Sequence, residues 1–101
     1  MINHRKNYLE GGFFFDPDDF IYQNHFPGNP VVPGSMIIHA FFEAIKNAGL
    51  EPGCLSAKNF KFKYFLTPGD YRYSLEFDKN KIICRLFGEK PDSLAEGTIL
   101  L

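Results

Sequence analysis

The chain has 101 residues and a formal net charge of −1, with 12 Phe, 5 Tyr and no Trp. This length predicts one small domain, and the near-neutral charge leaves no strong field to attract nucleic acid or an anionic membrane surface. Cys54 and Cys84 lie far apart without a CxxC spacing, which indicates neither a disulfide framework nor a zinc site. The sequence contains no basic segment followed by an apolar run and no apolar stretch long enough to cross a membrane, so we expect a soluble cytoplasmic domain.

The N-terminal part of the chain predicts short elements. Residues 1–12 are polar and end at two glycines, which indicates a tail or a short first element. Phe13–Phe15 and Phe20–Tyr22 are apolar runs on either side of the acidic turn cluster at residues 16–19. Each run favours a strand or strand fragment.

A helical pattern covers about residues 35–48. Its apolar residues recur at spacings of three and four: Ile37, Ala40, Phe41, Ala44, Ile45 and Ala48. This spacing places them on one face of a helix. Gly49 stands where a C-terminal cap is expected, and Pro52–Gly53 ends the segment.

The second half of the chain predicts an antiparallel sheet. Alternating or apolar runs at residues 60–64, 71–77, 82–87 and 94–101 are separated by turn residues at 67–70 and 78–80. Gly97, inside the last run, suggests a bulge. One buried helix with consecutive strands predicts a single α+β domain over residues 1–101.

The most informative stretch is His25–Ala40, which reads HFPGNPVVPGSMIIHA. Its first ten residues contain three prolines and two glycines, which together specify a rigid loop. The loop leads directly into the predicted helix, where unpaired backbone N–H groups are available. A histidine beside such groups suits a reaction in which a proton moves while an oxygen gains negative charge.

This stretch resembles the HFPGxPxxPG signature of the FabZ/FabA-type 3-hydroxyacyl-thioester dehydratases. The resemblance implies the hotdog fold, in which an antiparallel sheet wraps around one central helix. It implies loss of water from a (3R)-hydroxyacyl thioester to give the trans-2-enoyl thioester, as in fatty-acid, polyene or lipid synthesis. His25 would be the base, and the backbone N–H groups of Gly34 and Ser35 would stabilise the enolate oxygen. No metal or redox cofactor is implied, because the acyl group rides on the phosphopantetheine of acyl carrier protein or coenzyme A.

One position departs from the family pattern. The family places an acidic residue fourteen positions after the histidine, and here that position is His39. Three interpretations stay open. His39 substitutes for the acid; Glu43, about one helical turn further on, takes the role; or the site has lost dehydration and binds a thioester or complements a partner. His39 and Glu43 also fit an ordinary polar helix face.

Other candidate residues carry weaker signals. Val31, Val32 and Met36 would line an acyl channel, although apolar residues at these spacings also fit plain core. The lysines at 58, 61 and 63 form a basic strand edge that would steer an acidic carrier protein, or a solvated strand face. Convergence of His25, His39 and Glu43 on a metal has no further support, and we expect no metal site.

The resemblance also implies assembly, because hotdog dehydratases pair through their sheets with sites at the subunit boundary. We expect at least a homodimer, or a heteromer with another hotdog subunit, and no nucleic-acid partner. Two functional alternatives to a dehydratase stay open. One is a catalytically impaired subunit that binds acyl thioesters or completes a partner's site, and the other is an acyl-thioesterase.

Overall fold

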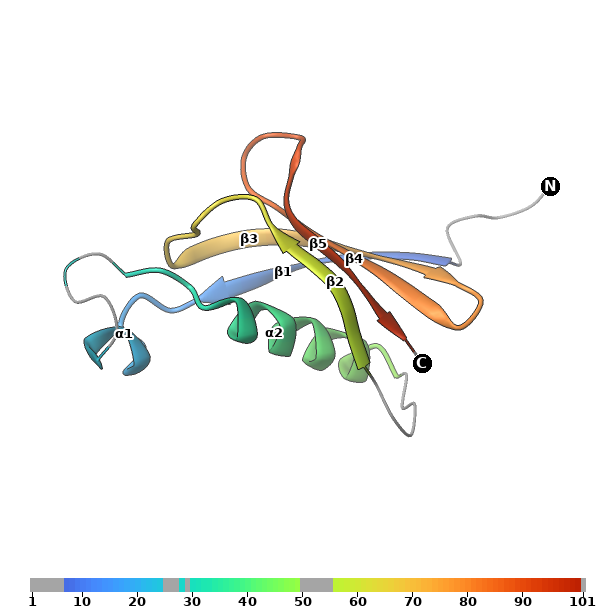
Figure 1. The fold of residues 1–101 in the computed structure, drawn as a ribbon, viewed down its shortest axis with the longest axis horizontal. Coiled ribbons are helices and arrows are strands. Elements are labelled where there is room, and N and C mark those ends of the chain that lie inside the picture. Colours follow the sequence, from blue (N-terminus) through green and yellow to red (C-terminus); the bar gives the residue numbers. More distant parts are fainter. Residues whose placement is uncertain (1–6, 25–27, 29, 50–55, 101) are drawn as a thin grey trace.

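A computed structural model describes residues 7–24, 28, 30–49 and 56–100. The elements are β1 (Tyr8–Phe15), α1 (Ile21–Asn24), α2 (Gly34–Asn47), β2 (Ser56–Phe62), β3 (Gly69–Asp78), β4 (Lys81–Phe87) and β5 (Ser93–Leu100). The strands form one five-stranded sheet in the order β1-β3-β4-β5-β2, and every pair is antiparallel. Figure 1 shows α2 lying along one face of this curved sheet. The predicted α+β class, with a sheet wrapped around one long helix, is confirmed.

Helix α2 forms where the apolar spacing predicts it. Ile37, Phe41, Ala44 and Ile45 are buried against the sheet, and Phe41 is 0% exposed. The helix begins one residue earlier than predicted and ends at Asn47, with Ala48 as its C-cap. Gly49 follows with φ +87°, a left-handed conformation that glycine adopts without steric cost, and its N–H donates to the Lys46 carbonyl at 3.0 Å. The stop predicted at Gly49 is therefore confirmed, while Pro52–Gly53 lies outside the described residues.

The sheet separates its two faces by simple alternation. The face toward α2 carries the sheet's contribution to the core, namely Leu75, Ile82, Cys84, Leu86, Ala95 and Ile99, each 0% exposed. The opposite face carries charged side chains, among them Arg85, which lies 3.2 Å from both a Glu76 and a Glu96 carboxylate oxygen. Although partial burial opposes the charge, the hydrogen bonds to these two carboxylates raise the pKa of Arg85.

Strand β1 begins earlier than the composition suggested. Residues 8–12 were expected to be tail or a separate short element, but they continue the strand that ends at Phe15 and pair with β3. Gly11 and Gly12 lack side chains, so the alternation of apolar and polar residues that is typical of a strand cannot be recognised here in the sequence. Gly11 lies beneath the Tyr73 ring, where a Cβ atom would come within 2.4 Å of the phenol oxygen. Absence of a side chain at Gly11 thus lets Tyr73 stack on Phe13 with ring centroids 4.3 Å apart.

Two further expectations are wrong. Phe20–Tyr22 is a turn leading into α1 rather than a strand, because the Asp19 carboxylate accepts a hydrogen bond from the Ile21 N–H at 3.1 Å and starts a helical turn. Gly97 is not a bulge, since it pairs in register with Cys84. The Phe60 ring occupies the place where a Gly97 side chain would be, so this glycine serves close packing.

The sheet has two edge strands, β1 and β2. Strand β2 contains a register shift between Lys58 and Lys61, and Asn59 at that shift has φ +58°. This geometry is a β-bulge with its extra residue in the left-handed conformation, which asparagine tolerates better than most residues. None of the helices within the described ranges is both long and apolar enough to span a membrane.

Candidate functional site

The N-terminus of α2 forms the backbone of the candidate site. Pro33 occupies the N-cap position, and its carbonyl accepts the N–H groups of Met36 at 3.0 Å and Ile37 at 3.2 Å. Within the described residues, no side chain caps this end and no carbonyl accepts from the N–H groups of Gly34 or Ser35. These two N–H groups lie at the positive end of the helix dipole, an arrangement that favours a bound oxygen carrying negative charge.

Gly34 has a second role in the shape of this end of the helix. A Cβ atom at Gly34 would lie 3.0 Å from the Phe62 ring, so the ring packs directly against the helix backbone. Phe62, at the end of β2, keeps 40% of its surface exposed. Sequence reasoning did not identify Phe62 as a site residue, because nothing local indicates that the end of β2 returns to the start of α2.

The structure places the predicted polar residues on one exposed face. Ser35, His39 and Glu43 follow each other at intervals of four residues, and all three are exposed. His39 therefore lies one helical turn beyond the uncapped N–H groups, and Glu43 one turn further. His25, the predicted base, lies outside the described residues together with its neighbours at 26, 27 and 29.

The predicted acyl-channel residues lie on the core side of the same helix end. Val32 is 4% exposed, and its N–H donates to the Leu66 carbonyl at 2.8 Å, which ties the loop before α2 to the segment before β3. Val31 and Met36 are half-buried, and Met36 packs against the core. The helix end therefore has an apolar side beside the two free N–H groups.

Tyr22 adds a polar group to this apolar side. Its ring is 6% exposed, and its hydroxyl donates to the Met36 sulfur at 3.7 Å. Burial, followed by the neighbouring Asp19, Tyr71 and Asp16, raises the pKa of Tyr22. Sequence reasoning assigned Tyr22 to a strand and missed it; its position three residues before His25 was the available signal.

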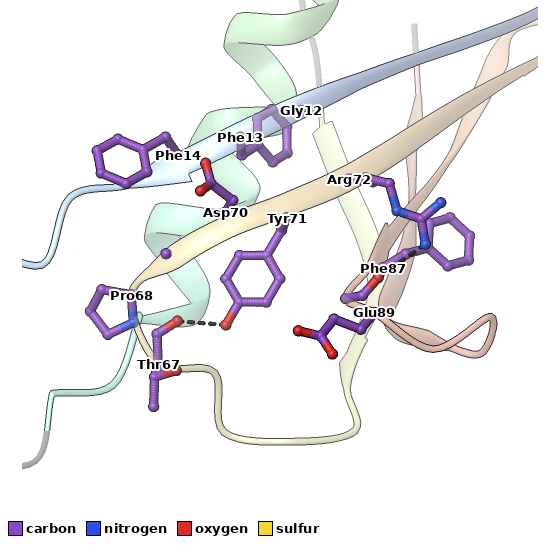
Figure 2. A pocket seen from close by; sticks show the side chains of 12 residues that line it. Gly12, Phe13, Phe14, Thr67, Pro68, Asp70, Tyr71, Arg72, Phe87 and Glu89 are labelled. Atoms are coloured by element: carbon purple, nitrogen blue, oxygen red, sulfur yellow. Dashed lines mark hydrogen bonds between the residues drawn. The ribbon is translucent and has the colours of Figure 1, made fainter.

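A separate groove lies at the β1–β3 end of the sheet, and none of the predicted site residues lines it. It has a volume of about 930 Å³ and runs past Phe14, Arg72 and Glu89. Figure 2 shows Arg72 beside Phe87 at its far end; the guanidinium carbon lies 5.8 Å from the ring centroid and one guanidinium N–H donates to the Gly88 carbonyl at 3.0 Å. The Tyr71 hydroxyl donates to the Thr67 carbonyl in the same view. Arg72 and Tyr71 therefore already make hydrogen bonds within the protein.

Two features away from the N-terminus of α2 concern metal binding and cysteine reactivity. Within the part of the chain that the structure describes, no group of three or more His, Cys, Asp or Glu side chains is placed to hold a metal ion. Cys84 is 0% exposed on the core face of β4, and burial raises the pKa of its thiol to about 12. A thiol with so high a pKa is a poor nucleophile at neutral pH, so Cys84 is a packing residue.

Comparison with known proteins identifies the family of the chain. Residues 2–97 match the family model described as ApeI-like, ApeI dehydratase. The 3-hydroxyacyl-(acyl-carrier-protein) dehydratase FabZ of Acetivibrio thermocellus is 32% identical in an alignment 94 positions long, which covers 77% of this chain and 62% of that protein. FabZ from a Sulfurovum species is 33% identical in an alignment 92 positions long, which covers 76% of this chain and 62% of that protein. The chain thus spans about three-fifths of the length of these curated relatives.

Solved structures agree on the fold. The dehydratase heterocomplex ApeI:P from Xenorhabdus doucetiae superimposes with a TM-score of 0.75 at 23% identity, covering 93% of this chain and 86% of the other. An uncharacterized protein from Erwinia carotovora subsp. atroseptica gives 0.73 at 22% identity, covering 92% and 81%. The hotdog fold that the His25–Gly34 motif implies is confirmed. The match to the family model covers nearly the whole chain, and the chain belongs to the ApeI-like dehydratase family.

Proposed function

We propose that the chain removes water from a (3R)-hydroxyacyl thioester, carried on acyl carrier protein or coenzyme A, to give the trans-2-enoyl thioester. The observation that carries this proposal is the uncapped start of α2. The N–H groups of Gly34 and Ser35 lie free of protein acceptors among the described residues, directly after the His25 loop and beside an apolar wall. Similarity to the FabZ dehydratases supports the same reaction class.

In the proposed reaction each group has one task. His25 takes the proton from the carbon next to the thioester carbonyl, because histidine is the side chain best suited to proton transfer near neutral pH. The electron pair of that C–H bond moves toward the carbonyl, whose oxygen gains negative charge and is stabilised by the Gly34 and Ser35 N–H groups. The double bond then forms as the C3–O bond breaks, and the departing hydroxide takes a proton to leave as water. Proton transfer and oxyanion stabilisation suffice, so the proposal includes no metal or redox cofactor.

We assign protonation of the leaving hydroxyl to His39. It occupies the position where the family places an acid, and its exposed side chain lies one turn from the N–H groups. As an imidazolium it donates a proton, and the resulting imidazole is neutral. Glu43 lies a further turn away, a displacement far above the roughly 1 Å tolerance of catalytic geometry, and is the weaker alternative.

The proposed site is completed by a second hotdog domain. His39 and Glu43 are exposed on the side of α2 opposite its buried face, so we infer that the catalytic histidine that works with His39 comes from the second subunit. The structurally similar Xenorhabdus protein is described as a dehydratase heterocomplex, which supports a hotdog partner for this chain as well. The replacement of the family's acid by His39 favours one alternative function, a subunit that binds the thioester and completes the site of an active partner.

The test is a dehydration assay with a 3-hydroxyacyl thioester on both carriers, following the enoyl product by absorbance and mass spectrometry. We expect turnover by the wild type and at least a 10²-fold loss in His25→Ala and His39→Ala, the size usual for a general acid or base. Glu43→Ala should keep most activity. His4→Ala removes a histidine with no assigned role and serves as the matched control.

The outcomes separate the interpretations. Activity that survives His25→Ala contradicts the proposed base. Activity lost in Glu43→Ala but kept in His39→Ala moves the acid role to Glu43. A folded wild type that is silent with both carriers leaves the thioester-binding subunit, which isothermal titration with the unreacted thioester then measures directly.

A further inference from the structure

Tyr22 of α1 is a buried tyrosine whose hydroxyl has only a weak partner. The residue is 6% exposed, and among the described residues its hydroxyl donates only to the Met36 sulfur, with 3.7 Å between oxygen and sulfur. A thioether sulfur is a weak acceptor, whereas a buried tyrosine hydroxyl usually finds a stronger partner. The Tyr22 hydroxyl is therefore available to exchange the sulfur for a better acceptor.

The position of the Tyr22 ring does not depend on this hydroxyl. The Tyr22 N–H donates to the Asp19 carbonyl at 3.1 Å, and the Asp19 N–H donates to the Asp16 carbonyl at 3.0 Å, so backbone hydrogen bonds hold the residue in place. The ring belongs to the same buried core cluster as Val32 and Leu66. Because the ring is held by its backbone and its packing, the hydroxyl can change partners without moving the ring.

The hydroxyl lies beside the start of α2. Its partner Met36 is the third residue of the helix, two residues after Gly34, which places the two backbones about 3 Å apart along the helix axis. Methionine has three rotatable side-chain bonds and adapts to irregular space. The Met36 sulfur can therefore move aside while the helix backbone stays in place, and the hydroxyl that it leaves is close to the uncapped N–H groups.

The surroundings of Tyr22 favour an uncharged acceptor over a charged one. Burial, followed by the neighbouring Asp19, Tyr71 and Asp16, raises the pKa of Tyr22, so the hydroxyl keeps its proton at neutral pH and acts as a donor. The same two aspartates would repel a carboxylate brought to the hydroxyl. An uncharged oxygen, such as that of an ether, a ketone or an alcohol, accepts the hydrogen bond without this repulsion.

We propose that Tyr22 is a specificity-determining residue that selects acyl chains carrying an uncharged oxygen acceptor beyond C3. Such an oxygen replaces the Met36 sulfur as the partner of the Tyr22 hydroxyl, whereas a plain alkyl chain leaves the hydroxyl on the sulfur. The inference rests on the proposed function, which puts the acyl chain on the apolar side of the start of α2. Binding of unreactive thioesters tests it without turnover, so the two proposals can fail separately.

The experiment compares coenzyme A thioesters of equal chain length. One carries the 3-hydroxydecanoyl chain, and the others carry the same chain with an ether oxygen in place of the sixth, seventh or eighth carbon. Each chain is also made without the 3-hydroxyl group as an unreactive ligand. We measure kcat/KM for the hydroxylated chains and Kd for the unreactive chains by isothermal titration. The quantity compared between variants is the ether-to-alkyl ratio, because a general loss of folded protein cancels in it.

Two substitutions should change this ratio in opposite directions. Tyr22→Phe keeps the ring but removes the hydroxyl, so a buried ether oxygen loses its donor and the ratio at the best oxygen position should fall about tenfold. Met36→Leu keeps the apolar volume but removes the sulfur, so the hydroxyl gains more from an ether oxygen and the ratio should rise at least about twofold. Tyr8→Phe is the matched control, because it removes the hydroxyl of an exposed tyrosine at the start of β1 and should leave the ratio unchanged. Circular dichroism checks that each variant is folded.

An ether-to-alkyl ratio that is the same in wild type and Tyr22→Phe at all three oxygen positions overturns the proposal, and so does an equal fall in Tyr8→Phe. Equal losses on ether and alkyl chains in Tyr22→Phe make Tyr22 a packing residue and also overturn it. Turnover of both chains by the wild type with ratios that do not depend on Tyr22 overturns this inference while leaving the proposed function intact. A Tyr22-dependent ratio in binding without any turnover has the opposite meaning.

Discussion

The close approach between Gly97 of β5 and the Phe60 ring of β2 gives a sharp test of how the edge strand is held. A Cβ atom added at Gly97 would lie 2.3–2.6 Å from three Phe60 ring carbons, well inside van der Waals contact. The backbone at Gly97 needs no positive φ, so alanine fits the conformation and only the ring obstructs it. Gly97→Ala therefore forces Phe60 away from Phe41 and Phe62.

The magnitude follows from two opposing effects. Overpacking in a well-packed core costs about 1–3 kcal/mol. Replacing glycine by alanine in a compatible conformation restores about 0.4–1 kcal/mol through the unfolded state. We expect Gly97→Ala to lower the free energy of unfolding by about 1–2 kcal/mol. In a Phe60→Ala background the obstruction is gone, and the same substitution should be neutral or stabilising by up to about 1 kcal/mol.

The assay is urea unfolding of the wild type, both single variants and the double variant, analysed as a double-mutant cycle. Gly12→Ala is the matched control, because its nearest obstacle is a backbone oxygen of Tyr71 at 3.4 Å and it should not be destabilised. An effect of Gly97→Ala that is the same with and without the Phe60 ring would refute the packing argument. A coupling of about 1–3 kcal/mol would support it.

Two further predictions concern single side chains. Burial raises the pKa of the Cys84 thiol from 9.0 to about 12, so the thiol of the unfolded chain ionises at lower pH than the thiol of the folded chain. The effect is measured in a Cys54→Ser background, where Cys84 is the only cysteine. The free energy of unfolding should then fall by about 1.4 kcal/mol per pH unit above about pH 9, beyond the fall measured for Cys84→Ala; equal slopes in urea titrations contradict the burial. Asn59 has φ +58°, so Asn59→Val should lose about 1–2 kcal/mol of stability whereas Asn59→Gly should not, as thermal unfolding would measure. Equal losses in both would rule out the left-handed conformation as the cause.

Elements whose signals lie within a few neighbouring residues could be predicted from the sequence. Helix α2 was predicted to within one residue at each end, because its apolar spacing and the glycine after it act within a few residues. The hairpin between β3 and β4 was predicted from its turn, where Lys79 adopts φ +55°. The His25–Gly34 motif indicated the family, and through the family the fold, because its residues are consecutive in the sequence.

Features that depend on contacts between distant segments could not be predicted and are seen only in the folded chain. The glycines of β1 looked like a break in the chain and Gly97 looked like a bulge, yet Gly11 and Gly97 each make room for an aromatic ring from a neighbouring strand. Phe62 became part of the site because β2 returns to the start of α2. Sheet order, which no local pattern encodes, left β2 at the edge with its lysines outward. Periodicity tells which side chains share a face, but which strand lies beside which is settled by packing over the whole chain.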